Sequence, residues 1–349
     1  MVEEEDLVAE ALVNVNNRDA QITAAARLCD MTGRQRHKLA EMGVIPPLIS
    51  LLHSRDHAAV EAALFALLAL AFGSERNKIW IAKFGAVPAI LNLLQGRGRA
   101  RGRGRSCRVF ESALAALLVL SSCSENKLLI ASSGCLGLLI SFLEEDESFF
   151  HMGERVIIDT VSTIQNLSIS PPVVPMIVAF GGVSCLLGVI VRLGTLHELT
   201  EKSTAVLEIL LSSSPAAVTE VASAGWGIRA MVMIVEEGSP QSKEHAVAVL
   251  LLVCRSCPEK YREVILREGV MPGLLQLTID GSQRAKELAQ HLLMLLRDSP
   301  GTRPGNKHSG HKYMERIMEE INANEGANDI EVGTALRMVE EMIARLKHE

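Results

Sequence analysis

The chain has 349 residues, of which 48% are hydrophobic and only 3% aromatic, and its formal net charge is −6. This mild negative charge provides no general attraction to nucleic acid or to anionic membranes. The seven scattered cysteines do not form a disulfide framework, and the first ten residues carry no secretory signal pattern. We therefore expect a reducing compartment, with a cytoplasmic and/or nuclear location.

The N-terminal segment, residues 1–18, is acidic and then rich in Asn. We expect a helix over residues 4–13 that either caps the structure or frays. Asp19 is a suitable N-cap for a helix over residues 20–31, because its carboxylate can accept a backbone N–H. Short helices are predicted next over residues 34–42 and 46–53.

Residues 61–94 contain the unit that the rest of the chain repeats. An apolar run is followed by a shorter run, a Gly-Ala-Val-Pro sequence and a third apolar run. Gly85 suits the left-handed end of the second helix, and Pro88 suits the first turn of the third. Three such helices cannot bury their apolar surface alone, so each unit has to stack on copies of itself.

The copies are located by the glycine before the third helix, at spacings of 42 to 49 residues. These glycines are Gly43, Gly85, Gly134, Gly181, Gly225 and Gly269. The period is typical of armadillo and HEAT repeats. The phrase Gly-Val-Ile-Pro-Pro-Leu-Ile-Ser-Leu-Leu at residues 43–52 resembles the armadillo repeat, and the pair Asn77-Lys78 recurs as Asn126-Lys127. The resemblance implies an all-α, right-handed armadillo superhelical solenoid of about six repeats over residues 19–297.

Two insertions disturb the register of the repeats. Residues 96–108 alternate Gly and Arg, which predicts a mobile loop. Its arginines are Arg97, Arg99, Arg101, Arg103, Arg105 and Arg108. These arginines can bind phosphates or an acidic protein surface, or they can act as a nuclear import signal. In the remaining alternative, the loop has no function and persists because a surface insertion costs little stability. The second insertion, residues 144–153, is acidic.

The predicted array ends at a linker rich in Pro, Gly and His, residues 298–312. Residues 313–349 form a predicted helical segment, whose last helix either packs back on the solenoid or forms a short coiled-coil seam. Residues 167–191 carry no charge, but three prolines and two glycines would break a spanning helix, so no membrane span is predicted.

No pattern in the sequence predicts catalysis, a cofactor or a metal. Cys254 and Cys257 form a C-x-x-C motif, but no second Cys/His pair stands at zinc-finger spacing and no βαβ setting surrounds it. His308 and His311 fall in the predicted linker. We therefore predict a protein that is not an enzyme.

The partner-binding residues are predicted from the family that the repeats resemble. In armadillo import receptors, the third helices line a concave groove in which a ladder of Trp and Asn holds an extended peptide. Of that ladder this chain keeps Asn166, while Phe65 and Ser162 stand at Trp positions. These departures favour an apolar groove for a helix or a folded protein partner. In an open alternative, Phe65 belongs to the core and Asn166 bonds a neighbouring helix.

Residues 20–297 also resemble the armadillo region of plant U-box ubiquitin ligases, in phrases such as Ser-Glu-Asn-Lys at residues 124–127. No U-box is recognisable in the chain. The resemblance implies a scaffold in ubiquitin or receptor-kinase signalling. Two alternatives are the substrate-binding part of a ligase assembly and a nuclear or nucleic-acid-associated adaptor that uses the Arg/Gly loop, although nucleic acid is the weaker expectation.

The fold prediction is tested by circular dichroism of the full chain. We expect a spectrum dominated by helix, because every predicted element has helical periodicity. Substantial β content would contradict the solenoid.

Overall fold

The computed structural model describes residues 4–14, 16–96, 105–144 and 153–297. All the regular structure in these residues is helical and none of it is strand, so the predicted all-α solenoid is confirmed. The helices divide into two compact units, Met1–Cys185 and Leu186–Glu349, which are described in turn.

The first unit begins with a helix, α1, that occupies the predicted residues 4–13 and packs on α2. Its main helices are α1 (Glu4–Val13), α2 (Arg18–Asp30), α3 (Gly33–Glu41), α4 (Ile45–Leu51), α5 (His57–Ala71), α6 (Glu75–Lys83), α7 (Ala86–Gln95), α8 (Arg105–Ser121), α9 (Lys127–Ile130), α10 (Leu136–Glu144), α12 (Glu154–Ser168) and α13 (Val174–Ala179). Short 3-10 and π turns, η2 (Ser124–Asn126) and η3 (Ala131–Cys135), flank α9. Helix α14 (Gly182–Leu193) contains the boundary between the units.

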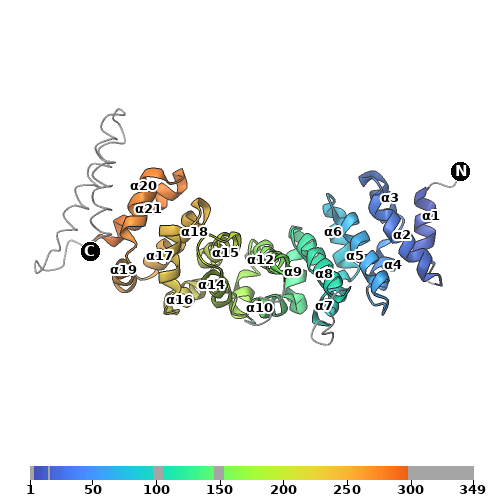
Figure 1. The fold of residues 1–349 in the computed structure, drawn as a ribbon, viewed down its shortest axis with the longest axis horizontal. Coiled ribbons are helices and arrows are strands. Elements are labelled where there is room, and N and C mark those ends of the chain that lie inside the picture. The colour runs from blue at the N-terminus through green and yellow to red at the C-terminus, as the bar shows by residue number, and fades with distance from the viewer. Residues whose placement is uncertain (1–3, 15, 97–104, 145–152, 298–349) are drawn as a thin grey trace, which may run out of the picture. The chain divides into compact units, whose positions relative to one another are not determined.

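The long helices of the first unit form one layer, in which α2, α5, α8 and α12 each pack on the next. We call it the long-helix layer. The short helices α3 and α6 lie along one edge of this layer, and α4, α7 and α10 lie along the opposite edge (Figure 1). Each repeat therefore supplies a long helix, a short helix and a third helix, as predicted.

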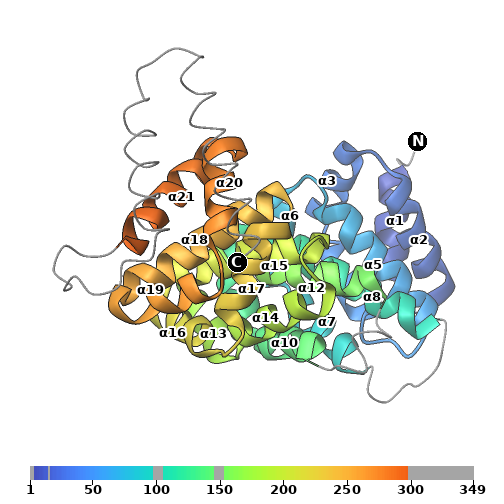
Figure 2. The ribbon, with the colours of Figure 1, turned by 60° about the vertical axis from the view of Figure 1, so that its left-hand side comes forward.

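The second unit repeats this plan (Figure 2). Its helices are α15 (Glu198–Ser213), α16 (Pro215–Ser223), α17 (Gly227–Glu237), α18 (Pro240–Ser256), α19 (Pro258–Arg267), α20 (Met271–Asp280) and α21 (Gln283–Leu296). Helix α18 packs on both α15 and α21, so these three form its row of long helices.

The predicted N-cap of α2 is wrong by two residues. The side chain of Asn17, rather than that of Asp19, accepts the backbone N–H of Ala20, at 3.0 Å. Helix α2 begins at Arg18, so Asp19 lies within its first turn. An acidic side chain in the first turn interacts favourably with the positive end of the helix dipole, but it does not cap the helix N-terminus.

The predicted Arg/Gly loop is shorter than expected, because α8 already begins at Arg105. The alternation with Gly stops at that point, and Val109 and Phe110 are buried immediately afterwards. Arg105 and Arg108 therefore belong to a helix, and Arg108 Nη1 lies 3.8 Å from Glu61 Oε1 of α5. The other tract arginines lie outside the described residues, as do residues 145–152 of the acidic insertion, the linker and the C-terminal segment.

The glycines that mark the repeats mostly adopt the left-handed conformation that the sequence predicts. Five of them, Gly43, Gly85, Gly134, Gly181 and Gly269, have φ between 82° and 94°. Gly225 does not have a positive φ, so it occupies the expected position in the repeat without adopting the left-handed conformation. There the chain turns through residues 224–226 before α17 starts.

The recurring Asn-Lys pair has a structural role at the ends of the long helices. Asn77 Nδ2 donates to the carbonyl of Leu70 at 2.8 Å, and Asn126 Nδ2 donates to that of Leu120 at 3.2 Å. Asn126 also donates to the carbonyl of Lys78 at 3.0 Å, in the preceding repeat. Both amides are buried, and they satisfy carbonyls that a helix end leaves without an intrahelical partner.

The uncharged stretch at residues 167–191 is divided among the end of α12, α13 and α14, as its prolines and glycines predict. Among the described residues, one helical segment, Ser124–Glu144, is long and apolar enough to cross a membrane. That segment is kinked at Gly134, and more than half of its apolar window is buried in the protein. Its apolar character therefore matches that of a core segment.

Replacing Gly85 with Ala tests the glycine turn. At φ 94° an added Cβ meets no atom within 4 Å, so the expected loss of about 1–2 kcal/mol in the free energy of unfolding comes from the left-handed backbone alone. Gly225→Ala is the matched control, because that site is equally open and lacks the positive φ. Urea denaturation of both variants measures the difference. Equal losses would contradict the explanation.

Candidate partner-binding site

Phe65 lies on the surface of the long-helix layer. It is 46% exposed, and Glu61, Phe65 and Ala69 follow one another at helical spacing along one face of α5. Glu61 faces Arg108 of α8, and the carbonyl of Ala69 accepts a hydrogen bond from Arg36 Nη1 of α3 at 2.9 Å. The ring is therefore a surface group between two polar bridges that link neighbouring helices.

The second predicted group lies on α12, where Arg155, Asp159, Ser162 and Asn166 share one face. Asn166 Nδ2 donates to Ser121 Oγ of α8 at 3.0 Å, and also to the carbonyl of Leu118 at 3.4 Å. Within the described part of the chain, Ser162 Oγ and Asn166 Oδ1 make no hydrogen bond. These two oxygens remain available to hydrogen-bond a partner.

The N-terminal end of the same face is charged. Burial raises the pKa of the Asp159 carboxyl, while Arg155, whose Nε lies 3.3 Å from Asp159 Oδ1, opposes the rise. The nearby carboxylate of Glu111 on α8 raises the pKa further. The face of α12 thus changes from an ion pair at Arg155 and Asp159 to neutral polar groups at Ser162 and Asn166.

The predicted residues share one layer without forming one compact cluster. Ser162 and Asn166 are one turn apart on α12, and Phe65 is on α5. Helix α8 lies between them and packs on both. A partner that contacts all three has to cross α8, which requires an extended contact surface.

The second unit carries an ion network that the sequence did not indicate. Glu208 is on α15, Glu244 and His245 are on α18, and Arg284 is on α21. His245 Nδ1 lies 2.7 Å from Glu208 Oε2, and Arg284 donates to Glu208 and, at 2.6 Å, to Glu244 Oε1. One guanidinium thus joins three successive long helices.

The charges of this network depend on one another. Burial opposes ionisation of Glu244, but hydrogen bonds from Ser282 and Arg284 outweigh it and lower the pKa of the carboxyl. The same contact with Glu244, despite some desolvation, raises the pKa of Arg284. The residues of this ion network are up to 76 positions apart in the chain, so no local sequence motif could have revealed the network.

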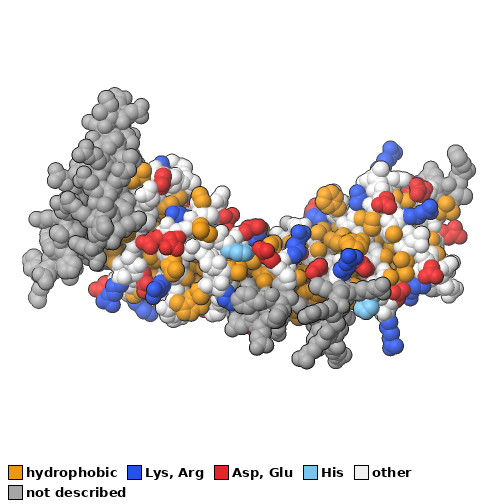
Figure 3. All heavy atoms as spheres, viewed as in Figure 1, with side chains coloured by type: hydrophobic (Ala, Val, Ile, Leu, Met, Phe, Trp, Pro, Cys, Tyr) orange, Lys and Arg blue, Asp and Glu red, His pale blue; other side chains and the backbone are white. Residues whose placement is uncertain are grey.

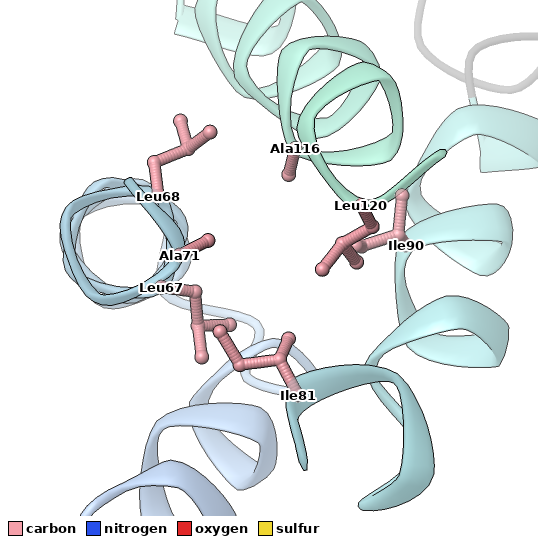
Figure 4. A pocket seen from close by; sticks show the side chains of 7 residues that line it. All are labelled: Leu67, Leu68, Ala71, Ile81, Ile90, Ala116 and Leu120. Carbon is pink, nitrogen blue, oxygen red and sulfur yellow. The ribbon is translucent and has the colours of Figure 1, made fainter. Parts of the chain in front are cut away.

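A small internal gap in the first unit is too small and too apolar for a ligand (Figure 4). It measures about 10 Å³, and side chains from α5, α6, α7 and α8 converge on it. They are Leu67, Leu68, Ala71, Ile81, Ile90, Ala116 and Leu120. A water molecule needs about this much room and also polar partners, which this lining does not offer.

An open groove of about 500 Å³ lies between α1 and α2.

The cysteine pair of the C-x-x-C motif is divided between two settings. Cys254 is buried near the end of α18, and Cys257 stands half-buried between α18 and α19. In the described ranges, no three His, Cys, Asp or Glu side chains are grouped closely enough to hold a metal ion. His308 and His311 lie outside the described residues.

Comparisons with known proteins support the fold. No family model matches the chain, and no curated protein matches its sequence. One engineered protein of solved structure is similar at 19% identity and a TM-score of 0.60, over 73% of this chain and 98% of its own. Another is similar at 15% identity and a TM-score of 0.51, over 85% of this chain and 100% of its own.

A designed armadillo repeat protein, solved in complex with the peptide (KR)4, is similar at 17% identity and a TM-score of 0.49, over 84% of this chain and 100% of its own. At these identities the similarities concern the fold alone. The chain has an all-α helical repeat fold, and its function has to be argued from its own surface.

Replacing Asn166 with Ala is expected to lower the free energy of unfolding by about 0.5–1.5 kcal/mol, because the link from α12 to α8 is lost. Asn92→Ala on α7 is the control, since Asn92 is exposed and makes no side-chain hydrogen bond within the described structure. Urea denaturation measures both. An unchanged stability would show that the amide is free to serve a partner.

Proposed function

We propose that this chain is a non-catalytic scaffold that binds a protein partner on the long-helix layer of its first unit. The observation that carries the proposal is the position of Phe65, which is 46% exposed midway along α5, in the layer that also carries the unbonded oxygens of Ser162 and Asn166. Aromatic side chains are enriched among the residues that dominate binding energy, because they offer a large apolar area at low entropic cost. Phe72 and Phe84 are more exposed, but they stand at helix ends, whereas Phe65 lies within a long helix.

Neutral polar groups on α12 supply the specificity in this proposal. Ser162 Oγ can donate and accept, and Asn166 Oδ1 can accept, a hydrogen bond from the partner. An apolar anchor with a few polar contacts suits a helix or a folded protein better than a strongly basic peptide. The oxygen of Asn166 is preoriented, because its Nδ2 is already bonded to α8.

The resemblance to the armadillo region of plant U-box ligases supports a role in ubiquitin or receptor-kinase signalling, in the cytoplasm and/or nucleus. An alternative is the substrate-binding part of a ubiquitin ligase assembly, in which another chain transfers the ubiquitin. An in vitro ubiquitination assay tests the non-catalytic assignment. Ubiquitin chains formed with this protein as the sole ligase would contradict it.

Replacing Phe65 with Ala is expected to weaken partner binding by about 2 kcal/mol or more, the scale of an aromatic hot spot. Phe84→Ala is the matched control. Phe84 is 55% exposed but ends α6 at the edge of the layer, so the proposal gives it no role. The melting temperatures of the two variants should fall by similar, small amounts, because each residue is already about half exposed.

The measurement is quantitative affinity purification with the wild type and both variants, followed by titration calorimetry with the purified partner. Partners should be depleted with Phe65→Ala and retained with Phe84→Ala. If both variants retain the same partners, the binding surface lies elsewhere.

A further inference from the structure

Lys127, at the start of α9, is a buried lysine without a counter-ion. It is only 6% exposed, and within the described residues it forms no ion pair and no hydrogen bond through its ammonium. Burial lowers the pKa of this ammonium, because the charged form loses hydration. Lysine is rarely this covered in proteins unless it is paired. Among the described residues, Lys127 Nζ is not one of the fully enclosed polar atoms without a partner, so the covered stem brings the ammonium to the surface, where an anion can reach it.

The preceding repeat contains the same lysine in paired form. Lys78 follows Asn77 just as Lys127 follows Asn126, and its side chain is similarly covered, at 12% exposure. Lys78 Nζ donates to Glu75 Oε1 at 2.5 Å and to Ser122 Oγ at 2.9 Å. The fold therefore accommodates a paired lysine at this position of the repeat.

The counter-ion has been lost from the next repeat. Glu75 stands three residues before Lys78, and the residue three before Lys127 is Ser124. Glu125, two residues before Lys127, accepts a hydrogen bond from Cys123 Sγ at 3.1 Å instead. The uncompensated charge is thus a difference between two copies of one unit, and packing does not require it.

Exposed apolar side chains lie close to Lys127 in the chain. Leu128 and Leu129 follow Lys127 on α9 and are both exposed, and α9 packs on α12, where exposed Ile169 follows the last residue. We call Lys127, Leu128, Leu129 and Ile169 the Lys127 patch. On the face of the molecule that Figure 3 displays, hydrophobic side chains lie among charged ones.

We propose that the Lys127 patch binds an acidic, apolar segment of a partner protein, with a carboxylate on the Lys127 ammonium and apolar side chains on the leucines and Ile169. The carboxylate restores the compensation that Glu75 gives to Lys78. This site uses none of the residues proposed for the long-helix layer, so each can exist without the other.

Neighbouring charges favour a peptide over a nucleic acid. Helix α6, which Asn126 ties to this region, carries cations at Arg76, Lys78 and Lys83, but acidic Glu75 and Glu125 are interleaved with them. Continuous phosphates would meet these carboxylates, whereas a single partner carboxylate can reach Lys127 alone. Aliphatic side chains also offer bases no aromatic stacking surface.

The test separates binding from stability with Lys127→Met, which keeps the length of the side chain and removes the charge. The probe is a short fluorescein-labelled peptide with a single Glu flanked by Leu residues, and its binding to the full chain is followed by fluorescence anisotropy. We expect the affinity to fall by at least about tenfold, as when one partner of a buried charge pair is removed. The melting temperature should hold or rise, because an unpaired buried charge destabilises the folded state.

Three controls define the result. Lys286→Met on α21 and Phe65→Ala should bind the peptide like the wild type, and a peptide with Gln in place of Glu should bind weakly. Leu128→Ser should also weaken binding; because Leu128 is exposed, this variant tests the patch even if Lys127→Met fails to fold.

Several outcomes would overturn the proposal. They are a wild type that does not bind the Glu-Leu peptide, full affinity in both Lys127→Met and Leu128→Ser, or equal binding of the Gln peptide. A single-stranded oligonucleotide that competes with the peptide only when Lys127 is present would assign the patch to nucleic acid instead.

Discussion

Coverage of each long helix by the next is the constraint on which the structure depends. Leu64 and Leu67 of α5 and Leu114 and Leu117 of α8 are all at most 2% exposed, in a layer where α5 packs on α8. Burial of one such side chain contributes about 1.5–3 kcal/mol, an amount that an isolated repeat would not gain. Since the core is built from contacts between neighbouring repeats, the outward face of the layer can vary in sequence.

Polar side chains support this stacking by crossing from one repeat to the next. Arg36 reaches the carbonyl of Ala69, Asn126 that of Lys78, and Asn166 both Ser121 and Leu118. The carbonyls of Ala69 and Leu118 lie near helix ends, where carbonyls lack intrahelical partners, while that of Lys78 lies within α6. A polar residue on the layer can therefore be structural through one atom and available through another, as Asn166 is.

The sequence predicts the elements well because helix periodicity and glycine turns are local signals. Helix α1 has the predicted bounds, and five of six marker glycines are left-handed. Predictions failed where tertiary burial decides a boundary, as when the burial of Val109 and Phe110 draws Arg105 into α8. The network around Arg284 was missed because its partners meet only through the packing of three repeats.

Comparison between copies shows which features the fold requires. In both Asn-Lys pairs, the buried Asn amide donates a hydrogen bond to a carbonyl at the end of a long helix, so this asparagine has a structural role. The two lysines differ, because only Lys78 has a carboxylate within reach. The asparagine is thus common to both copies, whereas the pairing of the lysine is not. The unpaired charge of Lys127 is the difference between copies that the proposed acidic partner would use.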